Sequence, residues 1–331
     1  MTRYVIIGAG ALGATLAAQL HESSVPYVLV ARERQVGLVR QQGLTYVRPS
    51  GEVTLPIEIT TADDLGDLQP DDVLVFTPKT QDLDGTLATW AWHPVAGGGV
   101  GADLPAITVQ NGLEAERQAL RRFATVLSAS FNLPARYVEP GVVEVRSAPL
   151  TGVVTIGRFP SGASAVAEQA AADWGRSGYA VEATDDIQRW KAAKLLFNVH
   201  NAVDVFSGDA ETVAELNEGL VTEARAALLA AGYSIAEKSE HTIDTSGFVV
   251  HDHPEGRAGG KSTWQSFARA DASGHEVDFL NGEVVLLGRL HGVPTPLNEA
   301  VQRILGQSFA SGEAPGAHDA REVLDAVAVP A

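Results

Sequence analysis

The stretch that decides the fold reads Tyr4-Val5-Ile6-Ile7-Gly8-Ala9-Gly10-Ala11-Leu12-Gly13. An apolar, β-prone run enters a G-x-G-x-x-G turn, and an Ala-rich helical segment (14–20) and a second apolar strand pattern (27–30) follow. This order is typical of the βαβ unit of a dinucleotide-binding domain, in which the first glycine allows a tight turn, the second lets the backbone approach a pyrophosphate, and the third lets helix and strand pack closely. The alternative is a glycine turn in some other α/β protein.

Strand and helix patterns alternate up to about residue 186, and after that only helical periodicity remains. We predict strands at 44–59 (as a hairpin), 72–76, 106–109, 126–130, 141–156 and 179–182, and helices at 113–123, 164–177, 187–206, 211–231, 261–271, 276–291 and 296–310. The sequence therefore predicts an α/β chain with a Rossmann-like doubly wound sheet in residues 1–186 and an all-α domain for substrate and dimerisation in residues 187–331. We expect an irregular loop at 241–260 and a partly disordered tail after residue 312.

Composition excludes several classes of protein. The chain has 331 residues, 45% of them hydrophobic, which is enough for a large core and two domains. A net charge of −17 argues against a nucleic-acid partner, because such binders present a basic face. The absence of cysteine excludes disulfides and thiolate metal sites. Since there is no apolar run of about 18 residues and no signal-peptide pattern, we expect a cytoplasmic protein without a membrane partner.

Two polar positions at predicted strand ends point to the cofactor. Arg32 follows the second strand, where NAD-preferring domains usually place an acidic residue, and its guanidinium can pair with a 2′-phosphate, so NADPH is favoured over NADH. The neighbouring Glu33 weakens this inference, and Arg32 could instead be a solvated surface charge. Lys79 follows the strand at 72–76 and could hold a phosphate or a carboxylate, or be an exposed loop lysine. Asn111 could be a plain turn residue before glycine.

The predicted helix at 187–206 carries a candidate proton donor. Lys194 and Asn198 are four residues apart and share one helix face, flanked by apolar residues. Burial beside apolar groups would lower the pKa of Lys194 toward values at which it can donate a proton at neutral pH. The alternative is that its ammonium extends to water. Lys191, on the next face, is expected to be the solvent-exposed lysine. His251-Asp252-His253 resembles a metal-ligand pair but has no third ligand, so we predict no metal site.

Two further motifs complete a family resemblance. Ser262-Thr263-Trp264-Gln265 and Glu276-x-Asp278-x-x-Asn281-Gly282 each open a predicted helix, and helix capping alone would also explain both. Together with the glycine turn and Lys194-Leu195-x-x-Asn198, they make the chain resemble the ketopantoate reductases (2-dehydropantoate 2-reductases) along nearly its whole length.

The resemblance implies a cytoplasmic oxidoreductase of pantothenate biosynthesis that reduces a 2-oxo acid with NADPH. It implies that Lys194 is the general acid for reduction of the C2 ketone. The implied cofactor residues are Gly8, Ala9, Gly10, Ala11, Leu12, Gly13, Arg32, Lys79, Asn111 and Glu276, and the implied substrate residues are Asn111, Lys194, Asn198, Asn201 and Ser262.

Two departures from the family pattern put the identity of the 2-oxo acid in doubt. The second family asparagine is expected four residues after the first, where this chain has Ala202, with Asn201 one place earlier, and the interval from Ser262 to Glu276 is longer by two. Alternatives are a reductase of another branched 2-oxo acid, an opine-type dehydrogenase, and a catalytically silent NADPH-binding regulator. A small-molecule substrate is the expected partner, and a homodimer remains open.

Overall fold

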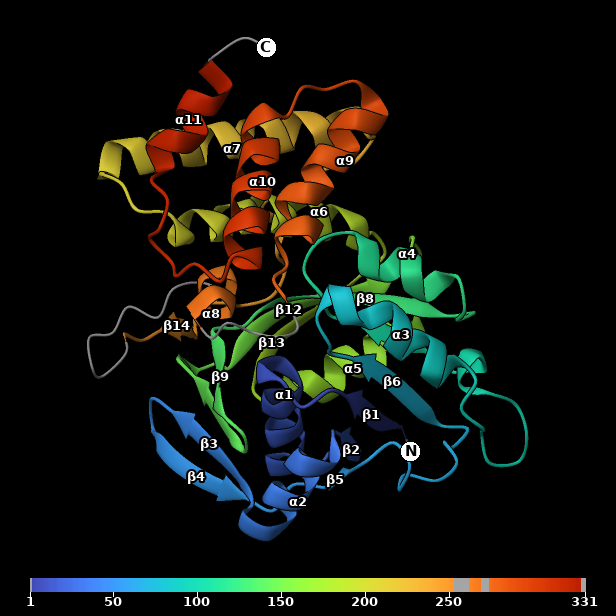
Figure 1. Cartoon of the computed structure of the whole chain (residues 1–331). Helices are drawn as coiled ribbons and strands as arrows, with labels where there is room; N and C mark the ends of the chain where they lie inside the picture. Colours follow the sequence, from blue (N-terminus) through green and yellow to red (C-terminus); the bar gives the residue numbers. More distant parts are fainter. Residues whose placement is uncertain (1, 253–261, 269–273, 329–331) are drawn as a thin grey trace.

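The computed structural model describes residues 2–252, 262–268 and 274–328, apart from the side chain of Ser262. The predicted change of architecture is present: a sheet-rich part carries a helical part on one side, and the two meet at the helices and strand ends in the middle of Figure 1. A large sheet with helices on both faces and a mainly helical C-terminal part match the predicted fold class.

The central sheet has eight strands in the order β13-β12-β8-β7-β6-β1-β2-β5. Its strands are β1 (Arg3–Ile7), β2 (Tyr27–Val30), β5 (Ile59–Thr60), β6 (Asp72–Phe76), β7 (Ala106–Thr108), β8 (Val126–Asn132), β12 (Gly152–Arg158) and β13 (Tyr179–Thr184). All neighbours pair in parallel except β8 and β12, which are antiparallel. The parallel strands are almost completely buried, which explains their continuous apolar runs in the sequence.

Helices cover both faces of this sheet and form two apolar layers. Helices α1 (Ala11–Glu22) and α5 (Ala165–Gly175) contribute to the core on one face. Helices α3 (Thr80–Ala91) and α4 (Glu114–Leu120) contribute to the core on the other. Because helix and sheet cores lie on both sides, the carboxyl ends of the parallel strands are left as the open edge where a ligand can bind.

Two smaller sheets flank the large one. The predicted hairpin is confirmed as β3 (Leu44–Arg48) and β4 (Gly51–Leu55). It joins β10 (Val142–Val145) and β9 (Ala135–Glu139) in a four-stranded sheet that contacts α1. The remaining elements of this half are α2 (Glu33–Gln42), the short 3-10 helix η1 (Gly101–Asp103) and β11 (Ser147–Pro149).

The C-terminal half is helical, with four differences from the prediction. Its elements are α6 (Ile187–Asn198), η2 (Val199–Val205), α7 (Ala210–Ala230), η3 (Lys238–Glu240), β14 (Phe248–Val250), α8 (Ser262–Ala268), η4 (Val277–Phe279), α9 (Asn281–His291), α10 (Pro296–Ala310) and α11 (Ala320–Ala328). The helix predicted at 187–206 changes to a 3-10 helix after Asn198, because the next seven residues include three valines, an asparagine and an aspartate, which favour α-helix poorly. The segment predicted as one helix at 276–291 likewise divides into η4 and α9.

The other two differences concern segments that carry weak sequence signals. The loop expected at 241–260 contains β14, which pairs antiparallel with β11 of the N-terminal half. The tail expected to be partly disordered forms α11, where Ala320 and Val323 are buried against the helical core. Both elements are stabilised by tertiary contacts more than by local propensity. Among the described helices, none has the length and apolar character needed to span a membrane.

Candidate active site

The glycine turn leaves open space at the N-terminus of α1. Gly8 has a φ of +110°, which favours glycine, and a Cβ at residue 13 would lie 2.0 Å from the Gly8 carbonyl oxygen and 2.6 Å from Thr77 Oγ1. At Gly10, by contrast, an added Cβ would meet no described atom within 4 Å. Gly8 therefore makes the tight turn and Gly13 the close packing that the sequence predicts, and the backbone at Gly10 is left open. An uncovered backbone at a helix N-terminus fits the pyrophosphate of a dinucleotide.

A cavity of about 360 Å³ lies where the two halves of the chain meet. Its lining residues are Ala11, Leu12, Val109, Asn111, Phe131, Asn132, Leu133, Pro134, Ala135, Arg136, Arg146, Lys194, Phe197, Asn198, Asn201 and Gln265. The cavity thus brings together six residues predicted from sequence, with the glycine-turn residues at one wall and α6 and η2 at another. The predicted strand-end residue Asn111 lines the same cavity.

Lys194 enters this cavity from α6 as a partly buried ammonium group. Burial, together with the positive charge of Lys191, lowers the pKa of Lys194 from 10.5 to about 8. Four residues later, Asn198 is 3% exposed, and its buried Nδ2 has no hydrogen-bond partner in the described part of the chain. A buried donor is costly when unsatisfied, so a ligand oxygen beside Asn198 would be stabilised.

The lowered pKa of Lys194 predicts an alkaline limit on activity. If this ammonium donates a proton during reduction, kcat/KM stays level below pH 8 and falls about tenfold per pH unit above it, because deprotonated lysine has no proton to give. The measurement is the initial rate of ketone reduction across pH at constant ionic strength. Full activity up to the ordinary lysine pKa of about 10.4 would contradict the assignment.

Lys191 is not solvent-exposed, and the sequence expectation for it is wrong. Its ammonium lies 2.8 Å from Glu116 Oε1 and donates a 2.5 Å hydrogen bond to the Gln110 carbonyl oxygen, with the side chain only 5% exposed. Ser128 and Thr108 donate to the same carboxylate. Helix α6 packs against β8 and β12 as well as against its own domain, so two of its faces are buried. Helical periodicity alone could not separate these two lysine environments.

Three other predicted residues, Arg32, Lys79 and Glu276, are not among those that line the cavity. Arg32 is exposed where the chain leaves β2 and enters α2. Lys79 donates to Ser266 Oγ at 3.2 Å and to the Gly274 carbonyl oxygen at 3.1 Å, so it reaches across to the helical half. Burial raises the pKa of Glu276, while Lys79, Lys191 and a hydrogen bond from Asn111 oppose that rise. Glu276 and Asn111 are thus in contact although they come from different halves of the chain.

Another glycine, Gly112, makes this close approach between the halves feasible. Gly112 has a φ of +79°, and a Cβ there would lie 2.4 Å from the carbonyl oxygen of Phe279 in η4. Any side chain at residue 112 would therefore push η4 away, and Glu276 precedes η4 directly.

The side chain of Ser262 lies outside the described residues, and so does His253. Among the described residues no group of three or more His, Cys, Asp and Glu side chains is placed to bind a metal ion.

Sequence reasoning missed the two arginines of the cavity. Arg136 on β9 pairs with Glu144 on β10, with Nε and Nη2 2.9 and 2.5 Å from the same oxygen. Arg146 follows β10 and has no carboxylate partner in the described part of the chain. The signal was present in the sequence, because Glu144 and Arg146 are two residues apart in a strand pattern and point to one face.

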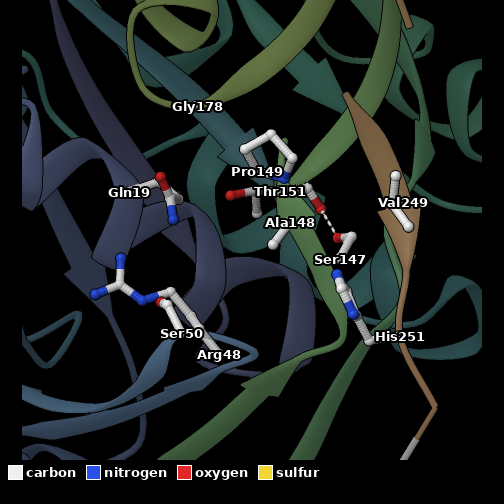
Figure 2. A pocket seen from close by; sticks show the side chains of 10 residues that line it. All are labelled: Gln19, Arg48, Ser50, Ser147, Ala148, Pro149, Thr151, Gly178, Val249 and His251. Carbon is white, nitrogen blue, oxygen red and sulfur yellow. Dashed lines mark hydrogen bonds between the residues drawn. The ribbon is translucent and has the colours of Figure 1, made fainter. Parts of the chain in front are cut away.

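A larger cavity of about 680 Å³ lies on the other face of the strand segment that carries Arg146. Figure 2 shows Gln19 of α1 and Arg48 of β3 on one side of it and Ser147, Ala148 and Thr151 on the other. Ser147 Oγ donates to the Thr151 carbonyl oxygen at 2.5 Å, drawn as the dashed line in Figure 2. The lining of this cavity includes none of the site residues predicted from sequence.

Comparisons with known proteins give matches over most of the chain. Two family models match, "Ketopantoate reductase PanE/ApbA" over residues 4–161 and "Ketopantoate reductase PanE/ApbA C terminal" over residues 186–308. A 2-dehydropantoate 2-reductase of Pyrococcus horikoshii is 24% identical over 88% of this chain and 93% of its own length. The fold is similar to a PanE/ApbA family ketopantoate reductase from Ralstonia eutropha JMP134 (TM-score 0.75, 19% identity, 94% of this chain and 99% of that one). It is equally similar to a D-mandelate dehydrogenase solved with NADH and anilino(oxo)acetate (TM-score 0.75, 18% identity, 94% and 99%).

Proposed function

Because the chain belongs to the ketopantoate reductase family of oxidoreductases, which use a nicotinamide cofactor, we propose that it reduces 2-dehydropantoate to pantoate with NADPH. The observation that carries this proposal is the shared cavity: Lys194 and Asn198 from the helical half face the same space as Asn111 and the open glycine turn. A dinucleotide-binding turn beside a proton donor is what ketone reduction requires.

In the proposed complex, each half of the chain has a separate task. The backbone N–H groups at the start of α1, around Ala11 and Leu12, bind the pyrophosphate, and Arg32 binds the 2′-phosphate. NADPH supplies the hydride that adds to C2 of the substrate. Lys79 and Glu276 hold the cofactor side of the site together across the two halves.

Lys194 acts on the substrate oxygen in this proposal. Negative charge grows on the ketone oxygen as it is reduced, and the ammonium both stabilises that charge and donates its proton. A pKa of about 8 makes Lys194 a better donor near neutral pH than an ordinary lysine while leaving it mostly protonated. Asn198, Asn201 and Ser262 bind the rest of the substrate, and the unsatisfied Nδ2 of Asn198 supports its part in this.

A second candidate function is reduction of a different branched or aryl-bearing 2-oxo acid. Ala202, which stands where the family pattern has an asparagine, is 1% exposed and packs in the helical core, so it cannot contact substrate. Asn201 lines the cavity in its stead, and Phe131, Leu133 and Phe197 add apolar surface. The likeness to a D-mandelate dehydrogenase fold is compatible with such a substrate.

The deciding experiment is NADPH oxidation with a panel of 2-oxo acids that includes 2-dehydropantoate, a branched aliphatic acid and phenylglyoxylate. A kcat/KM for 2-dehydropantoate well above the others supports the proposal, and a higher value for one of the others supports the second candidate. If the protein binds NADPH but reduces none of them, the reductase proposal is wrong.

The preference for NADPH over NADH tests whether Arg32 binds the 2′-phosphate. Arg32→Ala is expected to weaken NADPH binding by about ten- to a hundredfold and to leave NADH binding nearly unchanged, because a charge-assisted hydrogen bond contributes about 1.5–3 kcal/mol and NADH has no 2′-phosphate. Dissociation constants for both cofactors follow from fluorescence titration. Arg34→Ala, an exposed arginine two residues away, is the matched control. Equal losses for NADPH and NADH would assign Arg32 a structural role.

The proposal includes a cytoplasmic homodimer. Leu286 and Leu290 of α9 are 42% and 66% exposed and lie four residues apart on one helix face, which gives a second copy an apolar contact. Sedimentation velocity of the purified chain distinguishes monomer from dimer.

A further inference from the structure

We propose that Arg146 is the receptor for the substrate's carboxylate and that it makes the enzyme selective for free 2-oxo acids over their uncharged derivatives. This inference rests on the proposed reductase function. It assigns a residue that neither the cofactor turn nor the Lys194 helix supplies.

The backbone fixes the direction of the Arg146 side chain. Its N–H donates to the Pro134 carbonyl oxygen at 3.1 Å, which continues the pairing of β10 with β9. Side chains alternate along such a segment, so Ser147 faces the larger cavity of Figure 2 while Arg146 faces the cavity that Lys194 enters. The alternation of side chains along this segment therefore places the guanidinium of Arg146 in the cavity that Lys194 enters.

The charges that line the cavity distinguish Arg146 from Arg136 as the arginine available to an anion. Arg136, the other arginine in the lining, is neutralised by Glu144, whose side chain is 9% exposed. Arg146 has no such partner in the described residues, although the chain as a whole carries a net charge of −17. An uncompensated guanidinium in a partly enclosed cavity attracts an anion strongly, and its planar fork matches a carboxylate with two parallel hydrogen bonds.

The substrate is the anion that best fits this position. The phosphates of the cofactor already have the N-terminus of α1 and Arg32 as partners in the proposed complex. Lys194 is assigned to the ketone oxygen, and the amides of Asn111, Asn198 and Asn201 are uncharged, so among the described lining residues Arg146 is the cation left for the carboxylate. Because Lys194 and Arg146 line the same cavity of about 360 Å³, a 2-oxo acid bound there has one cation for its ketone oxygen and another for its carboxylate.

The test compares a 2-oxo acid with its methyl ester in wild-type enzyme and in Arg146→Gln. We expect kcat/KM for the acid to fall about ten- to a hundredfold, mainly through KM, because a charge-assisted pair is lost. The ester, which has no charge to lose, should react at nearly the wild-type rate. Arg146→Lys should retain part of the preference for the acid, and Arg158→Gln, an exposed arginine at the end of β12, is the control.

Binding of oxamate, measured by calorimetry with NADP⁺ present, gives a readout that needs no turnover. Arg146→Gln should weaken oxamate binding by a similar factor and leave NADPH affinity unchanged. The inference is overturned if acid and ester lose activity equally, if NADPH affinity falls while oxamate affinity does not, or if oxamate binds both proteins alike. Failure of the reductase function is a separate result, since it would appear as no reduction of any 2-oxo acid by the wild-type enzyme.

Discussion

Replacing Lys194 with alanine is expected to lower kcat for ketone reduction by about 10²–10⁴-fold and to leave NADPH binding intact. The expected loss is the usual contribution of a positioned general acid. Cofactor binding should survive because the glycine turn and Arg32 belong to the other half of the chain. Stopped-flow or steady-state rates give kcat, and fluorescence titration gives the NADPH dissociation constant.

Two further variants make the Lys194 result specific. Lys194→Arg should not restore the rate, because a guanidinium holds its proton at any pH the enzyme survives. Lys238→Ala removes an exposed lysine of η3 and should be nearly silent, which makes it the matched control. If turnover of Lys194→Ala stays within a few-fold of wild type while NADPH still binds, another group donates the proton.

Replacing Lys191 with methionine is expected to lower the free energy of unfolding by about 3–5 kcal/mol, as is usual when a buried ion pair loses one partner. Burial acts to raise the pKa of Glu116, but the charge of Lys191 and its hydrogen bond outweigh that and keep the pKa below its ordinary value. Without Lys191 the carboxylate is left buried and uncompensated, and the Gln110 carbonyl loses its donor. Urea unfolding followed by circular dichroism measures the change.

The double variant Lys191→Met with Glu116→Gln separates charge from packing. The amide keeps an oxygen that can accept from Ser128 and Thr108, so most of the lost stability should return. In the refolded double variant the pKa of Lys194 should rise, because Lys191 no longer repels its ammonium. The alkaline limb of kcat/KM then moves to higher pH. A double variant as unstable as Lys191→Met alone would show that the pair's charge is not what matters.

The parts of the site that could be predicted are those carried by local patterns. The glycine turn needs only ten consecutive residues, and its strand, turn and helix are where the sequence puts them. Lys194 and Asn198 are related by one helical turn, so their common face follows from the sequence alone. Asn111 is predictable because strand ends in an open α/β sheet meet at one edge.

The parts that could not be predicted depend on contacts between distant segments. Lys191 is buried by Glu116 and by the Gln110 carbonyl, which are about 80 residues away in the chain. The segment around β14 becomes a strand only because β11 offers it an edge. Arg146 could be placed on a strand face from its spacing, but nothing local says which cavity that face borders.

The pairing of β11 with β14 limits where this enzyme can be divided into fragments or recombined with its relatives. The helical half contributes one strand, β14, which pairs with β11 of the N-terminal half. Ser147 of β11 lies opposite Val250 of β14, and α8 follows β14 in the chain. A fragment cut at the start of α6 would expose the edge of β11, and unpaired strand edges promote association with other chains. Recombination between relatives with a crossover near residue 186 would mix a β11 from one parent with a β14 from the other. Chimaeras that exchange both strands together should therefore be recovered as soluble protein more often than those that exchange the helical half alone.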